Sequence, residues 1–368
     1  FACNCVEPHL FQIIYGAHYE PWRNRESSQY AYQRIATIAD HLHYTGGKNY
    51  HAGIGSQAED DLGGGHAHCG ALVYLGDNWP ASYRNTILMH NIHGRRINND
   101  ILKRTGSGYV GLHGADVMKA RDPWFVGVTL QAAPDGSVYS SDWSETGECH
   151  HTKNTRRETG RIFKISYGTP AKSTIANVAE LPDEKLVELQ VHKNDWWVRH
   201  ARRVLQERAA AGKDLSKSKQ QLRALYAEQT DVTRKLRALW ALHSIREADG
   251  VYIAALDDAN EYLRAWAIRF LMEFQTRETG IEEKLLAMAK QDESPLVRLE
   301  LASGLQRYPV EKRVPLAAAL LAHGEDAADQ NLPLMYWYAV EPLVNADLNQ
   351  FLALAKTSQI PLVRRHIA

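Results

Sequence analysis

The chain repeats the stretch Ser294-Pro295-Leu296-Val297-Arg298 as Ile360-Pro361-Leu362-Val363-Arg364, with the arginines 66 positions apart. Two weaker copies end at Arg199 and Arg264, and Arg298 follows Arg264 by 34 positions. If 34 residues make one period and 66 make two, the repeated unit is about 33 residues long. A fixed period of this size indicates stacked structural units, each of which needs its neighbours to bury its apolar side.

The residues of each unit are those of helices. Pro295 and Pro361 stand where a first helical turn tolerates a residue without an N–H group, and Ser294 is placed to cap. Further helices are expected between the copies, at 280–290, 311–322 and 346–356. We therefore predict an α-solenoid of HEAT-like helix pairs over residues 184–368, in which the repeated arginines bond the loops of neighbouring repeats and carry no chemistry.

The first half follows a different pattern. Short β-like runs, broken by Gly, Pro, Asn and Asp, lie at 71–75, 86–92, 124–131, 137–143 and 160–167. Such spacing is typical of small antiparallel strands, and Ala133-Pro134-Asp135-Gly136 has the composition of a hairpin turn. One segment differs, because Ile35, Ile38 and Leu42 recur at helical spacing. It predicts a helix over 30–42, inserted between strands of a β domain at 1–169, with a linker at 170–183.

Composition excludes some classes of function. The 368 residues include 43 Lys and Arg against 43 Asp and Glu, so no basic excess is present to bind nucleic acid. The longest apolar stretch, 315–322, is far shorter than the roughly 18 residues of a membrane-spanning helix. Because the chain opens at Phe1 and stops at Ala368, about two turns into a helix, we expect it to be part of a longer protein.

Histidines are concentrated in the first half and leave three interpretations open. His66-Ala67-His68 on a strand would place two imidazoles on one face, and Cys149-His150 adds further soft ligands. These groups could bind a transition metal, line a substrate pocket or form buried structural hydrogen bonds. Cys69 and Cys149 could also pair in an oxidising compartment. A c-type haem would need CxxCH, which the chain does not contain.

Three other motifs have a functional and a structural interpretation. Asp142 could act as a general base, or with Glu145 as a Ca²⁺ ligand, or tie its own strand-end turn. Arg95 and Arg96 could clamp a planar anion or be solvated charges at a strand edge. Gly106 to Gly111 spells GxGxxG, but the long helix and acidic residue of a dinucleotide site do not follow. We interpret it as a Gly-rich loop between strands.

Several blocks together carry a family resemblance. They are Gly65 to Gly70, Gly76-Asp77-Asn78-Trp79-Pro80, Asn91 to Asn98, Asp122-Pro123-Trp124-Phe125 and Asp142-Trp143. In these blocks the chain resembles membrane-bound dehydrogenases whose β-propeller is similar to that of soluble quinoprotein glucose dehydrogenase. In that family HEAT-like repeats follow the propeller, often with a haem-binding CxxCH module elsewhere. The resemblance implies that 1–169 are the closing blades of an incomplete β-propeller.

The resemblance also implies an activity. It points to an exported dehydrogenase, periplasmic or membrane-associated, that oxidises a sugar or alcohol with pyrroloquinoline quinone (PQQ) and Ca²⁺ and passes electrons to a cytochrome. The matching positions give candidate catalytic residues His68, Asp142 and His66, and candidate cofactor-binding residues Arg95, Arg96, His93 and Asp77. Candidate metal ligands are Asp142, Glu145, Cys149 and His150. The alternative is a non-catalytic propeller that binds glycan or protein, carried on a HEAT-like scaffold.

Overall fold

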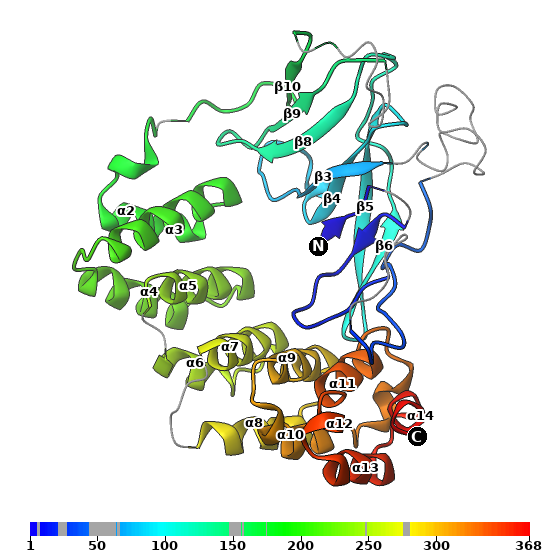
Figure 1. Ribbon diagram of the computed structural model, residues 1–368. Coiled ribbons are helices and arrows are strands. Elements are labelled where there is room, and N and C mark those ends of the chain that lie inside the picture. The colour runs from blue at the N-terminus through cyan, green and yellow to red at the C-terminus, as the bar shows by residue number, and fades with distance from the viewer. Residues whose placement is uncertain are drawn as a thin grey trace. The chain divides into compact units, whose positions relative to one another are not determined.

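The protein combines β-sheets and α-helices in two compact units (Figure 1). The computed structural model describes residues 1–368 except 6–7, 21–27, 44–63, 65–66, 147–155, 157, 174, 247–248 and 275–279. The first unit, called the β unit, comprises Phe1–Gln12, Thr37–Lys103 and Tyr109–Val204. The second, the helical unit, comprises Ile13–Ala36, Arg104–Gly108 and Leu205–Ala368. The expected boundaries at 169 and 184 mark where the chain changes from strands to helices. The two units do not divide there, because each contains segments from both sides of these boundaries.

The strands form antiparallel meanders. β3 (His68–Val73), β4 (Thr86–Asn91), β5 (Arg96–Thr105) and β6 (Gly108–His113) lie in that order in one sheet, in which β7 (Met118–Lys119) also pairs with β5. A second sheet has the order β10 (Arg161–Ile165), β9 (Val138–Asp142) and β8 (Gly127–Ala132). β1 (Ala2–Cys3) pairs with β2 (Leu10–Phe11). Each of the predicted β-like runs overlaps one of these strands.

Turn chemistry and an apolar core explain the sheet arrangement. Gly136 has φ +79° in the turn between β8 and β9, as predicted, and the Ala133 N–H bonds the Ser137 carbonyl. Gly106, with φ +50°, lies in the hairpin between β5 and β6, so the GxGxxG stretch begins in a loop between strands. The two sheets share one core, whose buried members are Tyr74, Trp79, Leu88, Ile97, Leu130 and Val138.

The helix predicted over 30–42 is wrong. In the described residues 28–43 the chain forms turns and isolated bridges instead. Ile38 is buried, as its spacing implied, but its N–H donates to the Leu10 carbonyl and its own carbonyl accepts from Gly111. Pairing with strands therefore replaces the i to i−4 hydrogen bonds of a helix, because tertiary contacts outweigh the weak preference of a short segment.

The second half of the chain is helical, as predicted. The helices are α2 (Asp183–Glu188), α3 (Asp195–Ala210), α4 (Ser216–Glu228), α5 (Val232–Ser244), α6 (Asp249–Ala255), α7 (Glu261–Phe274), α8 (Ile281–Gln291), α9 (Pro295–Leu305), α10 (Val314–Leu320), α11 (Leu332–Val340), α12 (Leu343–Ala346), α13 (Leu348–Thr357) and α14 (Pro361–Ile367). Short 3₁₀ turns lie at Ala81–Tyr83, Val178–Glu180, Leu189–Val191, Val310–Lys312 and Gly324–Ala328. No helix of the described residues has the length and apolar character that crossing a membrane requires.

The helices of the helical unit pack in two rows. In one row α5 contacts α7, α7 contacts α9, α9 contacts α11 and α11 contacts α14. In the other, α8 contacts α10 and α10 contacts α13. Ser294 accepts a hydrogen bond from the Val297 N–H at the start of α9, and Pro295 stands in the first turn. The cap and the proline positions were both predicted.

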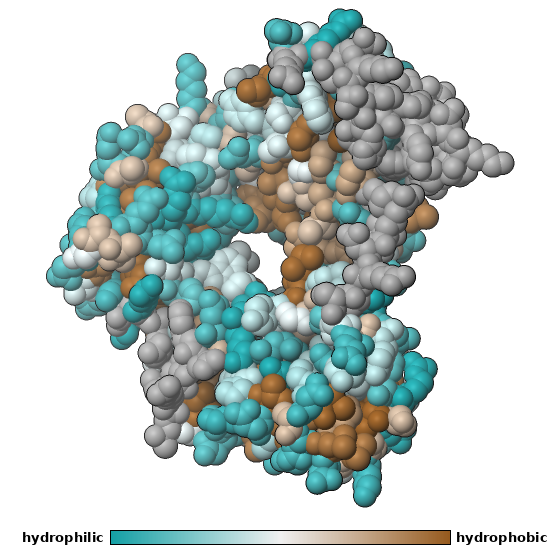
Figure 2. All heavy atoms as spheres, viewed as in Figure 1, coloured by the Kyte–Doolittle hydropathy of each residue, from teal (hydrophilic) through white to brown (hydrophobic). Residues whose placement is uncertain are grey.

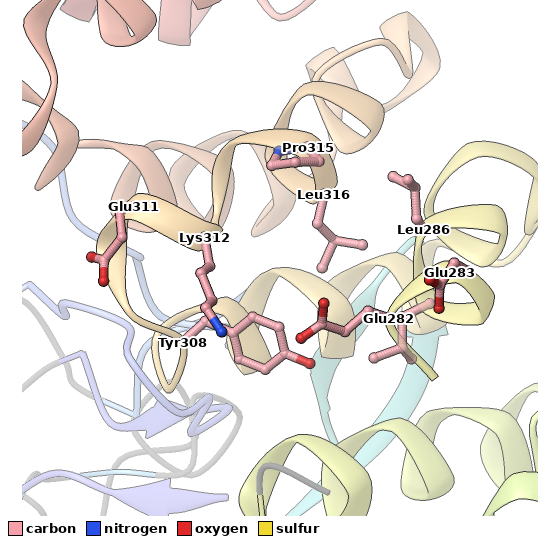
Figure 3. A pocket seen from close by; sticks show the side chains of 9 residues that line it. Glu282, Glu283, Leu286, Tyr308, Glu311, Lys312, Pro315 and Leu316 are labelled. Carbon is pink, nitrogen blue, oxygen red and sulfur yellow. The ribbon is translucent and has the colours of Figure 1, made fainter. Parts of the chain in front are cut away.

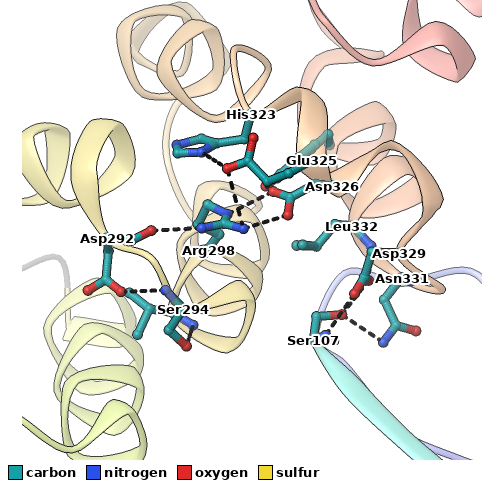
Figure 4. Close-up of polar contacts among 12 residues, drawn as sticks. Ser107, Asp292, Ser294, Arg298, His323, Glu325, Asp326, Asp329, Asn331 and Leu332 are labelled. Atoms are coloured by element: carbon teal, nitrogen blue, oxygen red, sulfur yellow. Dashed lines mark hydrogen bonds and ion pairs between the residues drawn. The ribbon is translucent and has the colours of Figure 1, made fainter. Parts of the chain in front are cut away.

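Two of the repeated arginines bond the next repeat. Arg264 donates through Nε and Nη2 to Asp292, at 2.7 Å and 2.9 Å. Arg298 donates in the same way to Asp326, at 2.7 Å and 2.6 Å (Figure 4). Each partner lies 28 positions further along the chain. The expectation is wrong for Arg199, which pairs with Asp195 of its own helix. The position 28 residues after Arg199 is Ala227, which has no carboxylate.

Candidate metal centre

Three histidines and one aspartate of the β unit converge on one point. His9 lies immediately before β2, His41 and His43 follow the bridge at Ala39, and Asp100 lies within β5. Each offers one ligand atom, and these atoms all lie within 4.8 Å of one another. In the part of the chain that the structure describes, no other group of three or more such residues is arranged in this way. We call these four residues the His₃Asp cluster.

Two of the distances within the cluster match those of a coordination shell, two are shorter, and all lie within 4.8 Å. His9 Nε2 lies 2.9 Å from Asp100 Oδ2, while His41 Nε2 and His43 Nε2 lie 3.5 Å and 3.4 Å from Asp100 Oδ1. His41 Nε2 and His43 Nε2 are 2.9 Å apart. Four ligands bound tetrahedrally at about 2.0–2.2 Å would be separated by about 3.3–3.6 Å. The cluster is close to that size before any ion enters it.

A second layer of hydrogen bonds orients two of the imidazoles. His41 Nδ1 lies 2.8 Å from Asp40 Oδ1, and His43 Nδ1 lies 3.0 Å from His68 Nε2. In metal sites the ring nitrogen that does not bind the ion usually donates to a carboxylate or a similar acceptor, which fixes the tautomer. Both contacts direct the Nε2 atoms of His41 and His43 toward Asp100.

Burial and charge favour the protonation states that metal ligands need at His43 and Asp100. At His41, burial is outweighed by the hydrogen bonds to Asp100 and Asp40, which raise the pKa of its imidazole. The side chains of His9, His43 and Asp100 are fully buried, and His41 is 14% exposed. Burial and the neighbouring imidazoles lower the pKa of His43 far below its usual value. Burial alone would raise the pKa of Asp100, but hydrogen bonds from His41 and His9 lower it well below its usual value. A neutral imidazole therefore faces an ionised carboxylate.

His113 borders the cluster without joining it. Its ring centroid lies 5.0 Å from that of His41 and 5.3 Å from that of His43. The side chain is half-buried, and burial and the charge of His41 lower its pKa. Aromatic contact with two ligand rings makes His113 a neighbour of the site.

Of the predicted catalytic residues, His68 lies beside the cluster and Asp142 has a different environment. Asp142 Oδ1 accepts the N–H groups of Val126 and Ser144 at 2.7 Å and 2.9 Å, and its Oδ2 accepts from Arg161 Nε at 2.6 Å. These bonds tie the turn after β9, which supports the structural interpretation of Asp142. His66 lies outside the described residues.

The sheet pairing brings His68 and Asp142 to the same end of their sheets. The Cys69 thiol donates to the Gly127 carbonyl at 3.4 Å, and Gly127 pairs with Asp142. Asp77 lies at the other end, against Gly136 in the turn between β8 and β9. His68 and Asp142 thus lie at one end of these sheets and Asp77 at the other.

The two predicted cofactor-binding arginines bond to the protein itself. Arg96 is buried and donates to Asp116 at 2.9 Å and to the Gly94 carbonyl. Arg95 donates to the Phe125 carbonyl at 2.8 Å, and burial lowers its pKa. His93 and Glu145 are buried. Cys149 and His150 lie outside the described residues, and with them the Cys69–Cys149 pairing.

The His₃Asp cluster was missed by the sequence analysis. The pair His41-Leu42-His43 has the same i, i+2 spacing as His66-Ala67-His68, and this was the one local signal. This signal was not used, because a helix was predicted over 30–42, up to the residue before His43. Residues two apart do not lie on the same face of a helix. His9 and Asp100 join the pair only through strand pairing that no local pattern encodes.

Comparisons with known proteins give one match. No curated protein and no solved structure matches the chain. Over residues 11–168, less than half of its length, the chain matches a family model described as a domain of unknown function (DUF7133). This part includes His41, His43 and Asp100, so the segment that resembles a known family is the one that provides three of the four clustered ligands.

Proposed function

We propose that the chain is a metalloprotein whose β unit binds one divalent transition-metal ion through His9, His41, His43 and Asp100. The convergence of four ligand atoms within 4.8 Å carries this proposal. Imidazole and carboxylate ligands suit Zn²⁺, Fe²⁺, Cu²⁺ and Mn²⁺, and of these ions Zn²⁺ is the one that structural sites usually hold with four protein ligands. We therefore propose Zn²⁺ as the resident ion.

The burial of the ligands favours a structural role for the ion. Three of the four ligand side chains are fully buried, so the site has little room for a substrate. The ligands come from the segment before β2, the segment after residue 37 and β5, which are far apart in sequence. One ion would cross-link these segments, and its binding free energy would add to the stability of the folded β unit.

Metal analysis tests this proposal directly. The full chain, purified without chelator and dialysed, is expected to contain about one zinc ion per molecule by inductively coupled plasma mass spectrometry. His43→Ala and Asp100→Asn should each reduce the zinc content at least tenfold, because each removes a ligand. His323→Ala, in the helical unit, is the matched control and should keep the wild-type content. Wild-type protein without metal that also fails to bind added Zn²⁺ would overturn the proposal.

We also propose a finer description of the two units. The meanders β3–β6 and β8–β10 would be successive blades of an incomplete β-propeller, and the two rows of helices a HEAT-like solenoid. The antiparallel order of each meander and the shared core support the first assignment. The repeated contacts along each row, with partners of Arg264 and Arg298 each 28 positions on, support the second.

A sugar or alcohol dehydrogenase of the quinoprotein type, exported and coupled to a cytochrome, is a second proposal. It rests on the resemblance of the β unit and on its meanders. The described residues do not fit PQQ or Ca²⁺ as they stand: Arg96 is paired with Asp116, and both oxygens of Asp142 accept protein hydrogen bonds.

A dye assay separates this second proposal from a non-catalytic glycan- or protein-binding role. Full-length protein incubated with PQQ, Ca²⁺ and a panel of sugars and alcohols should reduce a redox dye if the dehydrogenase proposal is correct. Absence of reduction with every substrate, together with saturable binding of a glycan, would favour the binding role. Neither result changes the expected zinc content.

A further inference from the structure

A cavity of about 390 Å³ opens on the helical unit, far in sequence from the metal ligands (Figure 3). It lies between the first turns of α8 and the stretch from Tyr308 through the start of α10. The helices α8 and α10 are neighbours in one row of the unit. The groove therefore occupies the junction of two consecutive repeats.

The floor of the groove is apolar. Leu285 and Leu316 are buried beneath it, and Leu286, Pro315 and the ring of Tyr308 complete its walls. Figure 3 shows Leu286 and Leu316 on opposite sides of the opening. A cavity of this size can receive one large aliphatic or aromatic side chain.

Figure 2 shows other hydrophobic atoms on the unit over α12 and α13, where Leu348 and Leu352 are 53% and 46% exposed.

The rim of the groove is acidic. Glu282, Glu283 and Glu311 are exposed and line the opening, where Lys312 is the one cation among the lining residues. Among the residues that the structure describes, these three glutamates form no ion pair. The negative charge of Glu282 also acts on the wall of the cavity. Burial and this charge together raise the pKa of the Tyr308 hydroxyl, which lies in that wall. An apolar pocket with an excess of negative charge around it complements a ligand that is apolar at its centre and positive at its ends.

We propose that this groove docks a basic peptide segment of a partner protein, with one large apolar side chain in the cavity and Lys or Arg side chains against Glu282, Glu283 and Glu311. The apolar anchor supplies most of the affinity, because central buried side chains dominate small interfaces. The charges select the partner and speed association. This inference is independent of the metal site, which lies in the β unit.

A fluorescent hexapeptide with a central tryptophan–leucine pair, flanked on both sides by lysine and arginine, tests the proposal by anisotropy with the full chain. We expect saturable binding at low ionic strength that weakens as salt rises. A peptide with glutamate in place of the basic residues, and one with alanine in place of the central pair, should each bind at least tenfold more weakly.

Variants of the protein test whether the peptide binds at this groove. The triple variant Glu282→Gln, Glu283→Gln, Glu311→Gln should bind the basic peptide at least tenfold more weakly, while Glu228→Gln, a charge removed from α4, should change affinity less than twofold. Circular dichroism checks that the triple variant is folded. No binding of the basic peptide at 1 mM (about 4 kcal/mol of binding free energy) would overturn the proposal. Equal binding by wild type and triple variant would also overturn it, and would assign the acidic residues to helix N-terminal stabilisation alone.

Discussion

Chelation of the metal is expected to lower the unfolding midpoint of the β unit by about 10 °C. An ion present at about a thousand times its dissociation constant stabilises the folded state by about 4 kcal/mol. For a unit of 150–250 residues each kcal/mol corresponds to about 2–4 °C. Differential scanning calorimetry of the full chain, with EDTA and then with excess Zn²⁺, measures the shift and its reversal. The helical unit, which contains none of the clustered ligands, should keep its own transition.

A neighbouring histidine provides the control for this experiment. His113→Ala removes an imidazole 5.0 Å from the ring of His41 but no ligand. It should retain the EDTA-dependent shift, whereas His43→Ala should melt at the lower temperature with or without EDTA. If EDTA leaves the wild-type midpoint unchanged while zinc is shown to be removed, the ion does not stabilise the fold. The metal site would then need another role.

Arg298→Ala is expected to destabilise the helical unit by about 3–5 kcal/mol. The guanidinium is 4% exposed and its partner Asp326 is 3% exposed, so the substitution leaves a buried carboxylate without its counter-charge (Figure 4). The hydroxyl of Tyr336 still donates to Asp326 Oδ2, at 2.6 Å, but it brings no positive charge. Urea denaturation of the full chain, followed by circular dichroism, measures the loss.

The repeat itself offers a matched control for Arg298. Arg199 holds the equivalent position in the sequence pattern, but its side chain is 63% exposed and its partner Asp195 is one turn away. Exposed pairs of this kind contribute about 0–1 kcal/mol. Arg199→Ala should therefore lie in that range. Equal effects of the two substitutions would show that the buried Arg298–Asp326 pair has no special importance.

Local patterns in the sequence predicted the helical second half of the chain and five of the ten strands that the structure describes. Helix caps and first-turn prolines, as at Ser294 and Pro295, depend on a few adjacent residues, and so does the turn ending in Gly136. Gly, Pro, Asn and Asp likewise marked the ends of the β-like runs. The role of Arg264 and Arg298 was also predictable, because a repeat of fixed period places equivalent side chains against equivalent loops.

The site could not be predicted in the same way. His41 and His43 meet Asp100 because the segment after residue 37 pairs with Leu10 and Gly111, whereas its apolar spacing indicates a helix. A spacing of residues carries no information about which distant strand a segment will join. The resemblance drew attention to His68 and Asp142, and only His68 lies beside the cluster.

X-ray absorption at the zinc edge of the zinc-loaded full chain tests the central claim most directly. The account predicts a shell of four nitrogen and oxygen atoms at about 2.0–2.2 Å, with the multiple scattering of three imidazole rings. Loss of this signal in His43→Ala would assign it to this cluster. A sulfur shell at about 2.3 Å, or a shell of oxygen atoms without imidazole, would contradict the claim that His9, His41, His43 and Asp100 hold the ion.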